Sequence, residues 1–291
     1  MLVGSLLRRS EWIFIAYLVY TALLAQLLPV RAPVPLVTAV LNLTIVTGFV
    51  LLAYADSLRR RRFLGIVRDW YPAPLMLLAY REMGWFALPH HTYHLERAWV
   101  AWDKTLLNDW GLRAAIECCG PVLPALLELA YALVYSIPVF SMAMLYAYGA
   151  RSRIDRFLVV FLPAILMCYA LFPYFPSEPP RTVFPGEDFP TVTTVFRRFN
   201  WWLLGGYGIH TSVFPSAHVA GGFSAAFAMM RLLREHRWVG RFLLVMAILI
   251  ATAVVYGRYH YAVDALAGVG ASLLAVGMAA AMERPVNRSL G

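Results

Sequence analysis

The chain has 291 residues, of which 61% are hydrophobic and only 14% are charged. Its mean hydropathy of +0.64 is too high for a soluble globular protein, and apolar runs long enough to cross a bilayer recur along it. The net charge of +9 could suggest nucleic-acid binding, but the arginines cluster in short loops between apolar segments. That placement is typical of the cytoplasmic loops of a multi-pass membrane protein, so we expect a membrane and no nucleic acid as partner.

The apolar segments predict an all-α bundle of about six to eight membrane-spanning helices. Arginine-rich loops at 59–62, 151–156 and 231–241 separate them and are expected on the inner side. The predicted spans are 12–29, 34–55, 122–148, 157–175, 213–233, 242–256 and 262–282.

One further crossing is needed between residues 63 and 120, because the arginine-rich loops on either side are both expected inside. The candidate is 71–89, which is short and carries Arg81 and Glu82. Such a polar pair is tolerated within a membrane when it faces the bundle interior. A re-entrant or surface-lying segment is the alternative.

Residues 93–110 carry apolar side chains at helical spacing, which predicts an amphipathic helix lying on the outer interface. We therefore divide the chain into residues 1–120, with the first spans and this interfacial segment, and a core of residues 121–291. The same topology places residues 176–211 and the turn at 258–264 together on the outer side.

Residues 213–220 place a proline, a hydroxyl and an imidazole at the start of a long apolar helix. Pro215 suits a first helical position, and Ser216 can cap the first turn. The free N–H groups of such a helix start favour an anion, and His218 would stand beside it. The alternative is an ordinary helix start with an incidental histidine.

Two further segments carry groups suited to phosphate chemistry. His260 and Asp264 are four residues apart, so on a helix the carboxylate can fix the imidazole tautomer and leave the other nitrogen basic. The proline-bounded turn 176–181 ends in Arg181, whose planar guanidinium matches the oxygens of a phosphate. Taken singly, these segments can also be read as a helix-stabilising polar pair and a loop arginine at the interface.

Together the three segments resemble the type 2 phosphatidic acid phosphatase superfamily. Its pattern is a basic residue among prolines, then Pro-Ser-X-His, then His-X-X-X-Asp. Residues 215–218 read Pro-Ser-Ala-His, and His260 with Asp264 follows in the same order. The resemblance covers roughly residues 121–282 and implies a six-helix-type phosphatase core.

The sequence departs from the usual pattern in its first and third motifs. Arg181 lacks the upstream lysine, and Val254 stands where an arginine usually precedes the histidine. Arg258 is the candidate substitute. These departures resemble the branch of inositol phosphorylceramide synthases and their bacterial relatives, which move a phospho-headgroup between lipids.

The resemblance implies an enzyme that acts on a lipid phosphate or phospholipid at the extracytoplasmic leaflet of the cell membrane. His260 would form a phosphohistidine, Asp264 would orient it, and His218 would serve as acid and base. No cofactor or metal is implied, and an alcohol or polyol would be the acceptor if the enzyme transfers rather than hydrolyses. The implied phosphate-binding residues are Arg181, Ser216, Ala217 and Arg258, with His210 as a further candidate behind them.

Two rival functions fit the sequence less well. A transporter of anionic lipids would show paired, broken helices near the membrane midplane, whereas the polar groups here gather at one face. A metal-dependent headgroup transferase would need several aspartates spaced along helices, and the aspartates of this chain are scattered. The sequence does not decide between hydrolysis and transfer.

Overall fold

The computed structural model describes residues 6–59, 62–87, 92–118 and 120–283. Within these ranges all regular elements are helices, which confirms the predicted all-α bundle. Six helices are long and apolar enough to cross a membrane, as judged by length and composition. They are Arg9–Leu27, Val34–Leu58, Val122–Ala147, Arg151–Tyr174, Arg234–Tyr256 and Ala262–Glu283.

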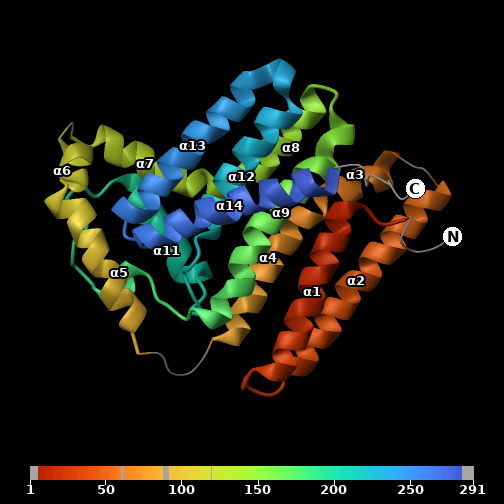
Figure 1. Ribbon diagram of the computed structural model, residues 1–291, viewed down its shortest axis with the longest axis horizontal. Coiled ribbons are helices and arrows are strands. Elements are labelled where there is room, and N and C mark those ends of the chain that lie inside the picture. The colour runs from red at the N-terminus through yellow and green to blue at the C-terminus, as the bar shows by residue number, and fades with distance from the viewer. Residues whose placement is uncertain (1–5, 60–61, 88–91, 119, 284–291) are drawn as a thin grey trace, which may run out of the picture.

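The first two helices, α1 (Arg9–Leu27) and α2 (Val34–Arg59), form an antiparallel hairpin at one side of the bundle (Figure 1). This hairpin packs through α1 against α9 (Ile154–Leu171). The hairpin is therefore an addition to the side of the central helices.

The short helices α3 (Arg62–Trp70) and α4 (Pro72–Met83) follow the course of α9. Asp69 accepts a hydrogen bond of 2.7 Å from Nε of Arg151, just before α9 begins. Near the other end of α9, the ring of Tyr80 lies 5.8 Å from that of Tyr169. The 12-residue α4 is not among the six candidate spans of the described residues, so the crossing at 71–89 stays a prediction, and residues 88 and 89 lie outside the described ranges.

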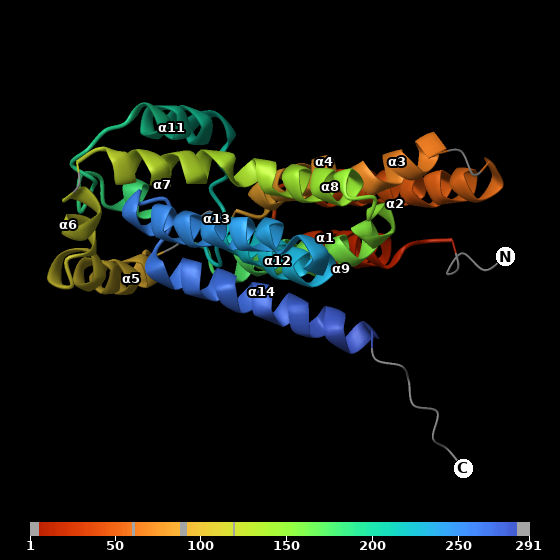
Figure 2. The same ribbon diagram turned by 90° about the horizontal axis from the view of Figure 1, so that it is seen from above.

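The segment 93–110, predicted as an amphipathic interfacial helix, forms α5 (His94–Lys104) and a π-helical turn at 105–109, and α6 (Leu112–Glu117) follows it. Its apolar residues do not share one buried face, because Trp99 is buried within the protein whereas Trp102 is 60% exposed. Together with α11 (Val195–Tyr207), this segment gathers at the end of the molecule away from both termini (Figure 2).

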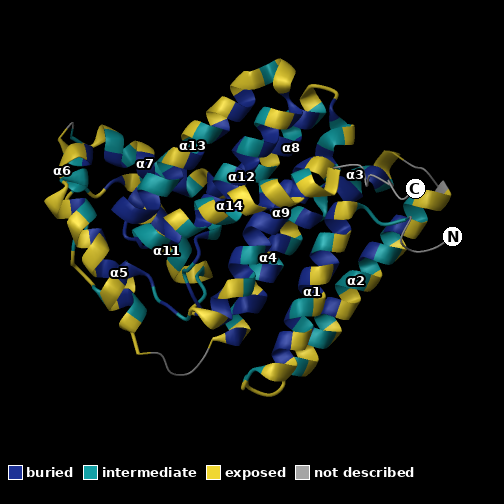
Figure 3. Cartoon of the chain, in the orientation of Figure 1, coloured by how far each residue is buried: buried dark blue, intermediate teal, exposed yellow. Residues whose placement is uncertain are grey.

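At the centre lies α12 (Ala217–Leu232), which packs against α9, α13 (Arg237–Tyr256) and α14 (Ala262–Glu283). It begins four residues later than the predicted span at 213. Its residues are mostly buried, whereas α14 exposes a long apolar stripe (Figure 3). Such a stripe is what a helix facing lipid requires.

The predicted span 122–148 is divided into α7 (Val122–Ala132), a 3₁₀ turn at Leu133–Ser136 and α8 (Ile137–Ala147). Pro138 explains the break, because its ring would collide with the carbonyl four residues earlier in a continuous helix. The break brings Tyr135 beside the start of α12, where its hydroxyl approaches His218.

Candidate active site

Three segments from separate parts of the chain meet at the end of the bundle where α12 and α14 begin. They are the short helix α10 (Pro180–Val183), the start of α12 and the loop between α13 and α14. A cavity of about 370 Å³ opens beside them. Of the predicted site residues, the cavity is lined by Arg181, Ala217, His218 and His260.

Ser216 caps α12 as predicted, and its Oγ accepts a hydrogen bond of 3.4 Å from Val219 N–H. Pro215 stands before the cap and not at the first helical position. The N–H of Ser216 donates to the main-chain carbonyl of Asp264 at 3.0 Å, which joins the two histidine segments. Ser216 is fully buried and does not line the cavity, so it acts on the site by fixing the helix start.

A glycine permits this contact between α12 and α14. A Cβ at Gly268 would lie 2.6 Å from the main-chain oxygen of Ser216, far inside van der Waals contact. Only a residue without a side chain allows α14 to approach the start of α12 so closely.

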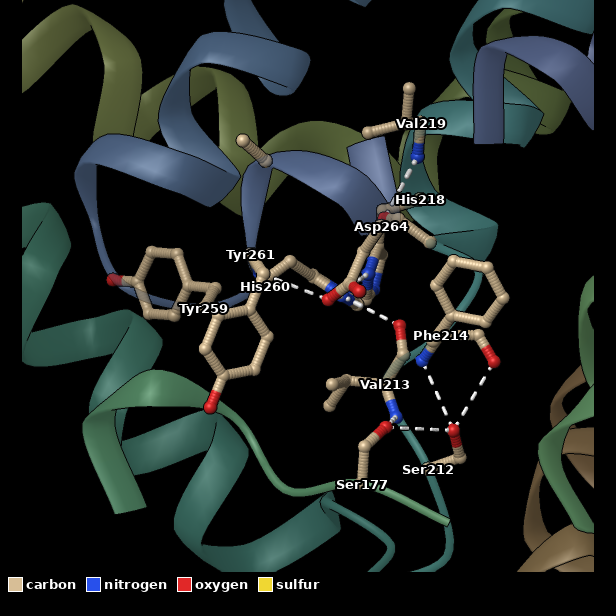
Figure 4. Close-up of polar contacts among 12 residues, drawn as sticks. Ser177, Ser212, Val213, Phe214, His218, Val219, Tyr259, His260, Tyr261 and Asp264 are labelled. Carbon is tan, nitrogen blue, oxygen red and sulfur yellow. Dashed lines mark hydrogen bonds and ion pairs between the residues drawn. The ribbon is translucent and has the colours of Figure 1, made fainter. Parts of the chain in front are cut away.

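The imidazole of His260 is held on one side through Nδ1 (Figure 4). Nδ1 lies 2.9 Å from the main-chain oxygen of Val213 and 3.3 Å from Oδ2 of Asp264. A carbonyl oxygen can only accept, so Nδ1 carries the proton and Nε2 keeps its lone pair. Burial, followed by the positive charge of Arg181, lowers the pKa of His260 to about 3, so the ring is neutral at neutral pH.

His218 lies directly in front of that lone pair. Its Nδ1 is 3.3 Å from Nε2 of His260, and its Nε2 is 3.4 Å from the hydroxyl of Tyr135. Because Nε2 of His260 is unprotonated, Nδ1 of His218 is the donor. The two rings are in contact, so a phosphorus atom bonded to His260 requires the ring of His218 to move aside.

Arg181 supplies the positive charge at the cavity. Its Nη1 donates a 3.3 Å hydrogen bond to the carbonyl of Tyr259, and its guanidinium carbon lies 5.7 Å from the centre of the Tyr259 ring. These contacts hold the guanidinium beside the two histidines and leave most of its N–H donors available for an anion.

The structure places Arg258 away from the cavity. It is fully buried in an ion pair with Asp103, with Nη1 2.6 Å from Oδ2. Its Nε and Nη2 have no hydrogen-bond partner among the residues that the structure describes. His210 is exposed and does not line the cavity either.

Several residues at the site carried no sequence signal. The N–H of Val213 lies 3.3 Å from Oγ of Ser177, which in turn contacts Ser212. This network holds the carbonyl that orients His260, but a backbone carbonyl has no identity in a sequence. Tyr135 gave no signal because it lies 83 residues before His218 and approaches it only through the break between α7 and α8.

A second buried network holds the loop before His260 from the side of α7 and α11. Glu128 accepts hydrogen bonds from Arg197 (2.9 Å), Asn200 (2.8 Å) and the hydroxyl of Tyr259 (2.5 Å). Arg197 and Glu128 are both almost fully buried, so this ion pair is shielded from solvent. The ring of Tyr259, the residue before His260, is thereby fixed in place.

Within the described part of the chain, no group of three or more His, Cys, Asp or Glu residues is arranged to hold a metal ion. The cavity lining brings together two imidazoles, one guanidinium and the N-terminus of a helix, with several tyrosines around them. Such a set can bind an anion, offer a nucleophile and move a proton.

A sequence model described as the PAP2 superfamily matches residues 97–278. The match begins inside α5 and covers all three motif segments, but it does not include α1 to α4. Neither the curated proteins nor the solved structures that were compared with the chain gave a match.

Proposed function

The chain belongs to the PAP2 superfamily of membrane phosphatase-type proteins, and from this premise we propose that it moves the phosphoryl group of a lipid phosphate through a phosphohistidine at His260. One observation carries the proposal. The unprotonated Nε2 of His260 lies 3.3 Å from His218, at a cavity that Arg181 also lines.

In the first step, Nε2 of His260 attacks phosphorus and the bond from phosphorus to the leaving oxygen breaks. His218, protonated when the anionic substrate binds, gives its Nδ1 proton to that oxygen and becomes neutral. In the second step, His218 takes a proton from water or an alcohol, whose oxygen attacks phosphorus. The phosphorus–nitrogen bond breaks and His260 is regenerated.

Arg181 and the N-terminus of α12 stabilise the charge on the phosphoryl oxygens. Phosphoryl transfer depends mainly on positioning and electrostatic stabilisation, and a guanidinium with free helix N–H groups supplies both. Ala217 is the first residue of α12 and lies in the cavity wall, and we assign its main-chain N–H as a helical donor to these oxygens.

The rest of the cavity wall is mostly apolar, with several tyrosines among its residues, which supports a lipid as the substrate. The wall extends from the two histidines to Leu77 on α4 and Val139 on α8, which are 54% and 48% exposed. A lipid could enter between these helices from the bilayer, with its phosphate at His260 and its chain along the apolar wall.

The positions of the basic loops support a site at the extracytoplasmic leaflet of the cell membrane. Arg151 and Arg153 precede α9, Arg234 precedes α13 and Arg237 begins it, all at the helix ends opposite the histidines. By the positive-inside rule, those ends face the cytoplasm. The polar groups of the site thus gather at one membrane face, which favours an enzyme over a transporter.

The test uses the purified protein in proteoliposomes with a radiolabelled lipid phosphate or phospholipid, with and without inositol or another alcohol. Free phosphate indicates hydrolysis, and a new labelled phospholipid indicates transfer. His260→Ala should lower turnover at least about 10³-fold and leave no acid-labile labelled protein.

The matched control is His236→Ala, at the opposite end of the bundle, which should leave turnover unchanged. Thermal unfolding in detergent shows whether the His260 variant is folded. A folded His260→Ala protein that retains wild-type turnover would refute the proposal.

A further inference from the structure

One face of α5 contacts all three segments of the candidate site. Glu96, Trp99 and Asp103 are spaced three and four residues apart, which places them on the same side of the helix. Their exposed fractions are 1%, 7% and 0%, unusual for two carboxylates on a helix at the end of a bundle. Buried carboxylates in such a position need specific partners.

Asp103 holds both ends of the loop that carries His260. Its Oδ2 accepts from Nη1 of Arg258 at 2.6 Å, and its Oδ1 accepts from the N–H of Ala262 at 2.9 Å. One carboxylate thereby fixes the residue two before His260 and the residue two after it. Arg258 has a φ of +62°, a conformation that a residue with a side chain adopts only when its surroundings enforce it.

Trp99 contacts the two histidine segments at once. Its ring stacks on Phe214, with centres 5.3 Å apart and planes at 28°, and lies 5.5 Å from the ring of Tyr261. Phe214 follows Val213, whose carbonyl orients His260, and Tyr261 follows His260 itself. Trp99 therefore sets the distance between the imidazole and the carbonyl that fixes its tautomer.

Glu96 reaches the third segment. Its Oε1 accepts a hydrogen bond of 2.9 Å from the N–H of Glu178, in the proline-bounded turn that leads to Arg181. The three buried side chains of α5 thus contact the turn that leads to the guanidinium, the segment before His218 and the loop around His260.

We propose that α5 positions the active site and that Glu96, Trp99 and Asp103 are its positioning residues. This inference rests on the proposed function. In this inference Arg258 helps to position His260 through its ion pair with Asp103 and does not bind the phosphate directly. Helix α5 then holds the proposed nucleophile His260, the acid–base residue His218 and the guanidinium of Arg181 in fixed positions relative to one another.

Asp103→Asn tests the inference with little change in shape. The amide oxygen can accept from only one of the two donors with full strength, and the charge of Arg258 loses its counter-ion. A displacement of about 1 Å at a reacting group costs roughly 10²-fold in rate. We expect kcat to fall by roughly that factor while KM changes less than about threefold.

Inhibition constants separate positioning from folding. Vanadate mimics the five-coordinate phosphorus of the transition state, whereas inorganic phosphate mimics the product, and neither constant depends on how much of the protein is active. If Asp103 positions the site, vanadate inhibition weakens in step with kcat and phosphate inhibition stays constant. If Asp103 only supports the fold, kcat falls with the active fraction and both constants stay at the wild-type value.

A second buried position of α5, with exposed positions in α5 and in the π-helical turn after it as controls, completes the test. Trp99→Leu should behave like Asp103→Asn, whereas Trp102→Leu and Asp109→Asn, both at exposed positions, should remain within about twofold of wild type. Equal losses in Trp99→Leu and Trp102→Leu would overturn the inference. A wild-type protein without phosphoryl transfer or vanadate binding would overturn the proposed function and this inference with it.

Discussion

At His260 the protonation state follows from burial and from the polar groups around the ring. The carbonyl of Val213 fixes the proton on Nδ1, while burial and the charge of Arg181 oppose a second proton. His218 and Asp264 also face the ring, at 3.3 Å each. The ring is therefore neutral over most of the accessible pH range, as the proposed nucleophile must be.

We expect the acid limb of kcat/KM to lie well below the ordinary histidine value of 6.5, because the pKa of His260 is lowered to about 3. As the pH falls towards that value, Nε2 gains a proton and attack stops. The neutral ring also stabilises the folded protein above pH 6.5. This stability is lost as the pH falls from 6.5 towards about 3, because His260 is protonated at a higher pH in the unfolded state than in the folded state. The measurement is kcat/KM between pH 4 and pH 8, corrected for ionisation of the substrate.

Arg181→Gln tests whether the charge of Arg181 helps to lower the pKa of His260. Removal of the guanidinium takes away a charge that lowers the pKa of His260, so the acid limb should move to higher pH. The overall rate should fall as well, since the phosphoryl oxygens lose a partner. An acid limb near pH 6.5 in the wild type, or no shift in the variant, would contradict this account.

At the scale of elements, the contact between α12 and α14 depends on Gly268. In Gly268→Ala the new Cβ would lie 2.6 Å from the carbonyl oxygen of Ser216, a backbone atom that cannot rotate away. The helices must separate, so we expect a loss of about 1–3 kcal/mol in stability and a lower kcat. Thermal unfolding in detergent and turnover measure the two effects.

Gly270→Ala is the control on the same helix, because a Cβ there meets no atom within 4 Å. This change should leave kcat unchanged and should not lower the unfolding temperature, since alanine favours a helix more than glycine does. If the two alanine variants behave alike, the close approach at Gly268 has no bearing on the site.

The elements show why one part of the site could be predicted and another could not. The contact of His260 with Asp264 could be predicted because the two residues lie four apart in the sequence. The cap at Ser216 could be predicted because it accepts from an N–H of the helix that follows it directly. The role of Arg258 depends on Asp103, which is 155 residues away in the sequence. No spacing rule connects such a pair, and the sequence therefore assigned Arg258 to the phosphate.

The same limit applied to the bundle as a whole. Hydropathy predicted the all-α class and most spans, because each span must be apolar over its own length. It did not predict the buried contact of Asn42 with Glu82, 2.9 Å across α2 and α4, or the pairing of Asp69 with Arg151. The first contact joins α2 to α4, and the second joins α3 to the turn before α9, which the superfamily match covers.

At the scale of the molecule, the helices outside that match help to form the cavity. Residues of α4, among them Ala73 and Leu77, line it together with residues of α8 and α9. Because the histidines and Arg181 lie at one end of the cavity, the α4 wall is placed to contact the chain of a lipid and not its phosphate. The N-terminal helices would then select among lipids without taking part in the chemistry.

Ala73→Phe tests this division of roles, because the larger side chain fills part of the apolar wall. We expect KM for a long-chain lipid phosphate to rise about tenfold, consistent with the roughly 1–3 kcal/mol that one misfit in an apolar pocket costs. Turnover of a short, water-soluble phosphate ester should remain unchanged, since the phosphate site is intact. Ala281→Phe, at an exposed position of α14, is the matched control and should affect neither substrate. Equal losses on both substrates in the Ala73 variant would mean that α4 supports the catalytic groups and does not select the chain.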